Sequence, residues 1–336
     1  MKIGEKIITE NDLYFWIEEG QASMGDFETA IKFIDTASEI GADGIEFQLA
    51  IPDEFYIATH PAIKHYSKIK FTNNQIAELI QYTKKNKINF IAAVLSKSLI
   101  PFLKENGCDA FVINASDINN PEIIDGVIES GLPFFISLPL ASESEIDWIV
   151  ERCMSKKASN YVLMHGQHTM ASGEHGVMPE HSNLGFLSTM KNKYNIPVGF
   201  IDHSPNSYMP SVARAAGANF ISKHLFLADN CTGPDWFVCQ NPEKMKATID
   251  LTRSVSMGLV SKEKVLAPGE NMDKTVMRRS IVATCDIPAG TVITMDLLAF
   301  KRPGKGLPPN EYEKLLGMKS IEIIKKDENI YLNNLE

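Results

Sequence analysis

Short apolar runs alternate with amphipathic stretches along the first 258 residues of the chain. Most of the runs are almost continuous in branched and aromatic residues, which is typical of parallel strands that are covered on both faces. The eight strands predicted from these runs cover residues 13–17, 44–48, 89–95, 110–114, 133–138, 161–166, 197–203 and 220–225.

Each apolar run is followed by a stretch with helical periodicity. In residues 27–40, apolar side chains recur at positions 27, 30, 31, 33, 34 and 37, which places them on one face of a helix. Asp26 is suited to cap this helix and Gly41 to end it. Further helices are predicted at residues 73–86, 98–106, 121–130, 142–154, 183–193, 208–216 and 241–258.

Strict alternation of strands and helices over roughly 250 residues predicts an α/β fold, a closed (β/α)8 barrel (TIM barrel). An open, doubly wound sheet is the alternative, because it shows the same alternation. The pattern then changes to a polar, weakly periodic segment, followed by short strands separated by Pro and Gly. We therefore predict a barrel domain over residues 1–259, a linker over 260–275 and a small β-rich domain over 276–336. The strands predicted in this last domain cover Ser280–Ala283, 291–293 and 295–300.

The composition narrows the classes of function. The 336 residues include 42 Asp and Glu against 33 Lys and Arg, and this net charge of −9 disfavours nucleic acid and anionic membranes as partners. No run approaches the ~18 apolar residues of a membrane span, and the N-terminus does not resemble a signal peptide. The five cysteines are scattered without a CxxC pair, which argues against disulfides and a thiolate zinc site. We expect a cytoplasmic protein that acts on a small molecule.

Two histidines fall at the ends of adjacent predicted strands, where the loops that form barrel active sites begin. They are His203, in the segment Asp202-His203-Ser204, and His224, which follows Lys223. Imidazoles on neighbouring strand ends can hold one divalent metal and leave positions open for water and substrate. Such a pair is weak unless water, a carboxylate or substrate completes the site. The alternative is two histidines hydrogen-bonded to the backbone at the barrel rim.

Acidic residues occur at the ends of the same strands. Glu18 and Glu19 end the first strand, and we expect one of them to point into the barrel mouth as a proton-transfer group. Glu46 and Gln48 share one side of the second strand, so Glu46 needs a partner if that side is the barrel interior. Asp235 follows a Gly-Pro turn and precedes a tryptophan, a pairing that suits a sugar but is also typical of an ordinary turn.

The loop after the sixth strand contains four histidines, His165, His168, His175 and His181. Their spacings match no compact zinc-ligand pattern, and Gly and Pro interrupt the loop. A substrate-contacting loop is therefore favoured over a zinc site.

Together these segments resemble the sialic acid (N-acetylneuraminate) synthase family, in which a (β/α)8 barrel is followed by a small antifreeze-like (SAF) domain. Each segment is weakly specific alone, but they occur in family order and cover nearly the whole chain. The matching segments are Gly25-Asp26, Gly41-Ala42-Asp43-Gly44, Phe47-Gln48, 116–120, Asp202-His203-Ser204, Lys223-His224, 233–235, 278–283 and 301–306.

The resemblance implies an enzyme that condenses phosphoenolpyruvate with an N-acetylated hexosamine aldehyde, such as N-acetylmannosamine, into a sialic-acid-like nonulosonic acid. It implies Mn2+ or Mg2+ on His203 and His224, with Glu18 and Asp202 as catalytic residues. It also implies a homodimer with swapped SAF domains that donate an arginine, for which we favour Arg279 over Arg278. The substrate-binding residues that it implies are Gln48, Asp117, Ser137, His168, Asp235 and Arg279.

The sequence departs from the family pattern mainly where the donor phosphate would bind. Glu46 and Val112 stand where the family has lysines, and Ala92-Ala93 stands where it has Ser-Thr. An apolar wall cannot replace the cations and N–H donors that a phosphate needs without a cost of several kcal/mol.

The residues that could serve the phosphate instead are His168, Lys97 and Lys223. Two other functions therefore stay open beside the synthase. One is a divergent enzyme that uses another donor or acts as an aldolase, and the other is a catalytically inactive sugar-binding paralogue.

Overall fold

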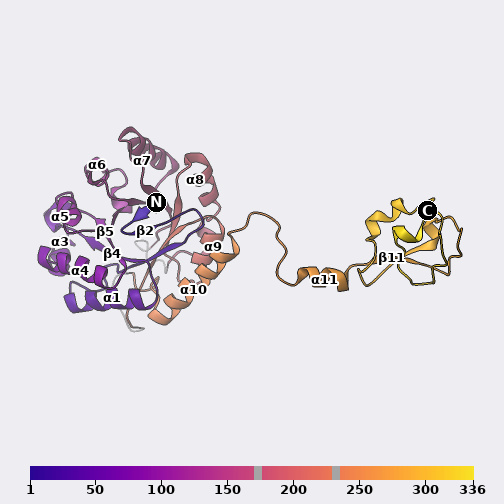
Figure 1. Ribbon diagram of the computed structural model, residues 1–336. Helices are drawn as coiled ribbons and strands as arrows, with labels where there is room; N and C mark the ends of the chain where they lie inside the picture. Colours follow the sequence, from indigo (N-terminus) through magenta and orange to yellow (C-terminus); the bar gives the residue numbers. More distant parts are fainter. Residues whose placement is uncertain (170–175, 229–234) are drawn as a thin grey trace. The chain divides into compact units, whose positions relative to one another are not determined.

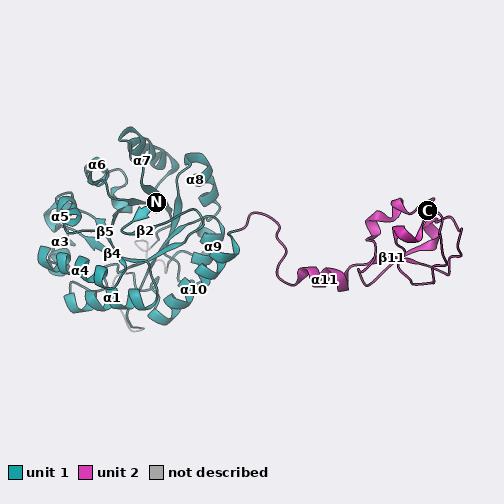
Figure 2. Cartoon of the chain, in the orientation of Figure 1, with its two compact units in different colours: residues 1–260 teal, residues 261–336 magenta. Residues whose placement is uncertain are grey.

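The computed structural model describes residues 1–169, 176–228 and 235–336. The chain divides into two compact units, Met1–Val260 and Ser261–Glu336 (Figure 2). The larger unit holds the strands and helices of the predicted barrel, and the smaller unit holds the β-rich segment.

Parallel strands close into a barrel in the order β10-β3-β4-β5-β6-β7-β8-β9 (Figure 1). The register places His224 of β10 beside Glu18 of β3, and Glu18 beside Glu46 of β4. Because β10 pairs with β3, the sheet is closed, which confirms the predicted barrel over the open sheet. The strands are β3 (Tyr14–Glu18), β4 (Gly44–Leu49), β5 (Asn89–Val94), β6 (Ala110–Ile113), β7 (Phe134–Ser137), β8 (Tyr161–His165), β9 (Val198–Asp202) and β10 (Phe220–His224).

One helix follows each barrel strand and covers it from outside, and these helices agree with the predicted ones to within a few residues. Side-chain caps fix where some of them begin: Thr72 and Gln75 form a capping box on α4, and Ser142 and Glu145 form one on α7. Within the described ranges, no helix has the length and apolar composition needed to cross a bilayer. The helices are α1 (Phe27–Glu39), α4 (Asn73–Lys85), α5 (Leu99–Glu105), α6 (Pro121–Ser130), α7 (Glu143–Ser155), α8 (Phe186–Tyr194), α9 (Met209–Ala215) and α10 (Pro242–Gly258).

Two short helices in the connection between β4 and the barrel helix α4 were not predicted. They are α2 (Pro52–Phe55) and α3 (Ile63–Ile69). Only Pro52 is buried in α2 and no residue is buried in α3, so neither segment carries an apolar periodicity. This insertion contributes to the site described below.

Side chains along each strand alternate between two apolar layers, one under the helices and one inside the barrel. Tyr14 and Trp16 of β3 belong to the interior layer, as does Phe135 of β7. Ile3, from the short N-terminal hairpin of β1 (Lys2–Ile3) and β2 (Lys6–Ile7), packs in the same interior cluster. The same alternation puts Glu18 on the interior side of β3, at the carboxyl end of the barrel.

The second unit has a small core of its own, built from nine buried apolar residues. Its regular elements are α11 (Glu270–Met277) and the antiparallel strands β11 (Ser280–Ala283) and β12 (Leu298–Lys301). Three local details differ from the predictions here. Residues 270–275 of the predicted linker are helical and belong to α11, which buries no side chain. The strand predicted at 291–293 is reduced to an isolated bridge between Val292 and Lys319. Met295–Leu297 forms a 3-10 turn, so the strand predicted from residue 295 begins only at Leu298.

Candidate active site

A pocket of about 300 Å3 lies at the carboxyl ends of the barrel strands, and we call it the central pocket. Strand ends and the loops after them supply most of its wall, and the α2–α3 insertion supplies the rest. Its lining residues are Glu18, Glu46, Gln48, Phe55, Tyr66, Leu95, Val112, Asn114, Ala115, Ser116, Ser137, Pro139, Leu140, His168, Ile201, His203, His224 and Asp235.

His203 and His224 lie beside each other in this pocket, with ring centroids 5.4 Å apart. His224 ends β10 and His203 directly follows β9, so the pairing of these two strands sets their separation. Nδ1 of His203 donates a hydrogen bond to the backbone oxygen of Gln167 at 2.9 Å. Burial first, and then the neighbouring His224 and His168 rings, hold the pKa of His203 well below its usual value. The ring is therefore neutral, and its Nε2 keeps a lone pair.

The residues around His224 suit a divalent metal ion. Among the described residues, the buried Nε2 of His224 has no hydrogen-bond partner, and it lies 3.4 Å from Oε2 of Glu18. A buried nitrogen without a partner is costly, and coordination to a metal would satisfy it. In the part of the chain that the structure describes, no group of three or more His, Cys, Asp or Glu could hold an ion alone. An ion on His203 and His224 would therefore complete its coordination with water or substrate oxygens.

Of the two glutamates that follow each other at the end of β3, Glu18 faces the central pocket. Gln48 donates its amide to Oε1 of Glu18 at 2.8 Å and so orients the carboxylate. Glu19 instead accepts the backbone N–H groups of Gln21 and Ser23 and folds the loop after β3. Glu18 is thus the carboxylate available for proton transfer.

Gly20 allows the loop after β3 to lie close to the imidazole of His224. Its φ is 58°, and a Cβ at this position would lie 2.6 Å from Nδ1 of His224. A side chain at position 20 would therefore displace the imidazole, so the site requires glycine here.

Glu46 lies on the side of β4 that faces the barrel interior, and its side chain is 3 % exposed. Its partner is the indole of Trp16, which donates to Oε2 at 2.7 Å. Burial, followed by the charge of Glu18, raises the pKa of Glu46 well above its usual value. Glu46 is therefore held as a neutral acid where the resemblance implies a lysine.

The central pocket contains no Lys or Arg among its described lining residues. Lys223 does not reach it: Nζ is fully buried and binds Asp202 Oδ2 and the backbone oxygen of Ser204, each at 2.7 Å. Lys97 lines a different cavity, between α5 and α6. Only His168 of the three alternative phosphate ligands lies in the pocket, and burial lowers its pKa.

The structure brings most of the predicted site residues together. Glu18, Gln48, Ser137, His168, His203, His224 and Asp235 all line the central pocket. Asp202 does not: its carboxylate is fully buried and paired with Lys223, so it positions the strand ends rather than touching the pocket.

Two further predicted residues lie outside the pocket lining. Asp117 binds the Ser116 hydroxyl and the Asn120 amide, and Ser116 lines the pocket in its place. Arg279 belongs to the second unit, where its guanidinium donates to the backbone oxygen of Phe300.

The histidine-rich loop does not form one cluster. His165 bonds to the backbone oxygen of Ser182, His168 lines the central pocket, and His181 is exposed. His175, and the Gly-Pro turn before Asp235, lie outside the described residues.

Phe55, Tyr66 and Asn114 are among the lining residues that were not predicted from the sequence. Phe55 and Tyr66 pack against Tyr56 at centroid distances of 4.5 and 5.0 Å. The concentration of aromatic residues between positions 55 and 66 was visible in the sequence and could have indicated a site element.

Comparisons with known proteins agree with this architecture. The NeuB family matches residues 33–264 and the SAF domain matches residues 278–336. An uncharacterized protein of Methanocaldococcus jannaschii is 29% identical, covering 100% of this chain and 98% of its own. The N-acetylneuraminate-9-phosphate synthase of Mus musculus is 28% identical over 95% of this chain and 91% of its own. The N,N'-diacetyllegionaminic acid synthase of Campylobacter jejuni is 26% identical over 93% and 97%.

Solved structures show the same fold. The N-acetylneuraminic acid synthetase of Leptospira borgpetersenii, in complex with citrate, superposes with a TM-score of 0.75 at 26% identity, covering 81% of this chain and 94% of its own. The spore coat polysaccharide biosynthesis protein SpsE of Bacillus subtilis gives 0.69 at 23% identity, covering 100% and 99%. With a family match over more than half of its length, the chain is a member of the NeuB family with a C-terminal SAF domain.

Proposed function

We propose that this protein is a metal-dependent synthase that condenses phosphoenolpyruvate with an N-acetylated hexosamine aldehyde to form a nonulosonic acid. The observation that carries the proposal is the pair His203 and His224. Both are buried beside Glu18 in the barrel mouth, and Nε2 of His224 has no partner. Membership of a family that includes synthases of such acids supports the same reaction.

In the proposed reaction, C3 of phosphoenolpyruvate forms a bond to the aldehyde carbon of the sugar. Water adds to C2 of the former enol, and inorganic phosphate leaves. A bound Mn2+ or Mg2+ would supply Lewis-acid polarisation of the aldehyde oxygen.

The residues of the central pocket divide the remaining tasks. Glu18 accepts a proton from the attacking water, with its carboxylate oriented by Gln48. Asp235 and His168 hydrogen-bond the sugar, and Ser137 donates to the donor substrate from the β7 side of the pocket. Glu46, whose pKa is raised by burial and by the charge of Glu18, offers a proton-bearing oxygen rather than a second negative charge.

A second candidate differs only in the donor. Because no described residue lining the central pocket is Lys or Arg, a donor without phosphate, such as pyruvate, is specifically favoured by this observation. The reaction would then be an aldol addition, in which a C3 proton is removed, the C–C bond forms and the aldehyde oxygen is protonated. No phosphate would leave.

The smaller unit contains Arg279, the arginine favoured from the sequence as a cation for the donor. We include in the first proposal a homodimer in which the SAF domain of one copy presents Arg279 to the barrel of the other. An Arg279→Ala variant should then raise the KM for phosphoenolpyruvate, and sedimentation should show a dimer.

One experiment distinguishes phosphoenolpyruvate from pyruvate as the donor. The Mn2+-loaded protein is incubated with phosphoenolpyruvate or pyruvate and a panel of N-acetylated hexosamines, and both phosphate and 2-keto acid are measured. Equal amounts of phosphate and new keto acid are expected from phosphoenolpyruvate. Product from pyruvate alone would establish the aldol reaction instead, and no product from either donor would reject both.

A further inference from the structure

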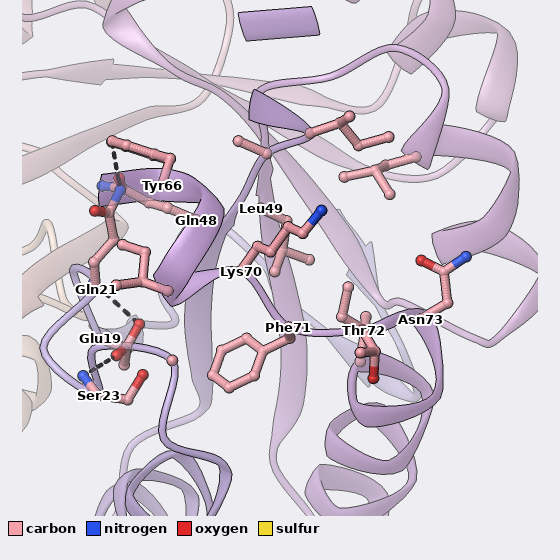
Figure 3. A pocket seen from close by; sticks show the side chains of 16 residues that line it. Glu19, Gln21, Ser23, Gln48, Leu49, Tyr66, Lys70, Phe71, Thr72 and Asn73 are labelled. Carbon is pink, nitrogen blue, oxygen red and sulfur yellow. Dashed lines mark hydrogen bonds between the residues drawn. The ribbon is translucent and has the colours of Figure 1, made fainter. Parts of the chain in front are cut away.

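A second cavity, which we call the side pocket, lies next to the central pocket and has a similar volume of about 310 Å3. The loop after β3, the end of β4, α3 and the start of α4 form its walls (Figure 3). Gln48 and Tyr66 line both pockets. The side pocket therefore borders the region where the proposed acceptor sugar would bind.

The wall shared by the two pockets consists of side chains joined by hydrogen bonds. Gln21 Nε2 donates to Gln48 Oε1 at 2.9 Å and to the Tyr66 hydroxyl at 2.6 Å, as Figure 3 shows for the second contact. All three side chains are only partly buried. A ligand amide could replace these neutral bonds at little net cost, because one hydrogen bond would be exchanged for another.

The inner surface of the side pocket is mainly apolar, with amide groups along one side. Leu49, Ile76 and Leu99 are almost fully buried around it. Gln21 and Gln48 supply carboxamides that can both donate and accept. A cavity with an apolar floor and a few such carboxamides fits a small neutral group that has an apolar part and a part that donates and accepts hydrogen bonds.

The charged residues argue against an anion in the side pocket. Glu19 lines it, but its carboxyl oxygens accept backbone N–H groups of its own loop, so it is not a free ligand. Lys70 also lines the pocket, but its side chain is exposed to solvent. A phosphate would need cations or N–H donors around it, and here it would face a carboxylate.

We propose that the side pocket is a subsite for an acylamino substituent of the acceptor sugar, on a carbon remote from its aldehyde. The acyl group contacts the apolar floor, and its N–H and C=O replace the bonds between Gln21, Gln48 and Tyr66. This inference rests on the proposed function, because it assumes that the acceptor lies in the central pocket.

The test compares two acceptors that differ only at C4: 2-acetamido-2-deoxymannose and 2,4-diacetamido-2,4-dideoxymannose. Affinity is measured by calorimetry without donor, and KM by keto-acid formation. Removal of the second acyl group from water should give the diacetamido sugar an advantage on the order of tenfold in both quantities. Equal affinities in the wild-type protein would overturn the proposal.

Two variants test whether the preference for the diacetamido sugar arises in the side pocket. Ala50→Phe fills the cavity from the end of β4, and Asn73→Trp closes it from an exposed position at the start of α4, where added bulk is compatible with folding. Each should abolish the difference between the two sugars. Ala62→Phe adds the same bulk at a half-buried alanine that lines neither pocket and should keep the difference. A preference that persists in both pocket variants would refute the subsite.

Failure of the proposed function gives a different result. If no keto acid forms with either sugar, the synthase is rejected, while calorimetry still decides the subsite. Tighter binding of the diacetamido sugar that is lost in Ala50→Phe and Asn73→Trp would support the subsite alone.

Discussion

At the scale of single residues, the central pocket combines groups whose ordinary charges have been changed by burial. His203 is neutral because the protein excludes water from its ring, which leaves Nε2 as a ligand at neutral pH. Glu46 is neutral for the same reason and because Glu18 lies on the next strand. Burial disfavours the charged form of either group, so it lowers the pKa of the base His203 and raises the pKa of the acid Glu46.

Glu46 should make the barrel less stable as the pH rises. Its folded pKa lies above the unfolded value, so between these two values the folded protein holds a proton that the unfolded chain has released. The free energy of unfolding then falls by about 1.4 kcal/mol per pH unit above pH ~4.5 until the folded pKa is reached. Glu46→Gln should remove this slope, and denaturant unfolding at pH 5 and pH 7 measures it. Glu151→Gln, at an exposed position of α7, is the control and should keep the wild-type slope.

Removal of either imidazole should abolish tight metal binding. We expect His203→Ala and His224→Ala each to weaken Mn2+ binding by on the order of 100-fold, because the remaining histidine is a single protein nitrogen ligand. Calorimetric titration with Mn2+ provides the measurement. His181→Ala, at an exposed position of the histidine-rich loop, should bind as the wild type does. Unchanged affinity in both site variants would show that the metal lies elsewhere.

At the scale of elements, a buried ion pair joins the ends of β9 and β10 on the side that faces the helices. Lys223 and Asp202 form a fully buried ion pair, and both neighbour a histidine of the central pocket. Since alternate residues of a strand face opposite ways, the pair lies outside the barrel while His203 and His224 lie inside it. The pair thus fixes the register of the two strand ends that carry the imidazoles.

Breaking this ion pair from one side should destabilise the barrel strongly. Asp202→Asn leaves the Lys223 charge buried without a counterion, so we expect a loss of about 3–5 kcal/mol in the free energy of unfolding. Replacing both residues, as Asp202→Asn with Lys223→Met, should restore a large part of it. Asp250→Asn, in the exposed pair with Lys246, should cost less than about 1 kcal/mol. Lost turnover without lost stability in Asp202→Asn would instead indicate the catalytic role that the resemblance implied.

At the scale of the whole molecule, two separate apolar cores are connected by a segment with no core of its own. Residues 257–269 are all exposed, and α11 after them buries no side chain. The larger unit contains every residue of the central and side pockets, whereas Arg279 belongs to the smaller one. The proposed metal and sugar sites thus lie in the first unit.

Limited proteolysis should cut this connecting segment first. Trypsin is expected to cleave after Lys262 or Lys264, because exposed segments without regular structure are the preferred sites of proteolysis. Mass spectrometry would then detect a fragment that ends near residue 262 and retains Mn2+ binding. Early cleavage inside the barrel helices, with the segment intact, would contradict this division.

The sequence by itself determined the alternation of strands and helices, because buried parallel strands and amphipathic helices impose distinct periodicities on the residues. The pairing of β10 with β3 then decided for the closed barrel over the open sheet. The sequence also located Glu18, Gln48, His203 and His224 at strand ends, where the topology alone brings them together. It could not place α2 and α3, which bury only Pro52 and so leave no pattern to detect, and Tyr66 was therefore missed.

Only the tertiary structure decided which charges face the substrate. Lys223 and Asp202 lie in the same segments as the imidazoles, yet strand alternation and pairing turn them away from the pocket. Glu46, in contrast, faces inward, where burial and the charge of Glu18 raise its pKa well above the usual value. Charge state and direction depend on neighbours that are distant in the chain, and for that reason the periodicity of a single segment does not contain them.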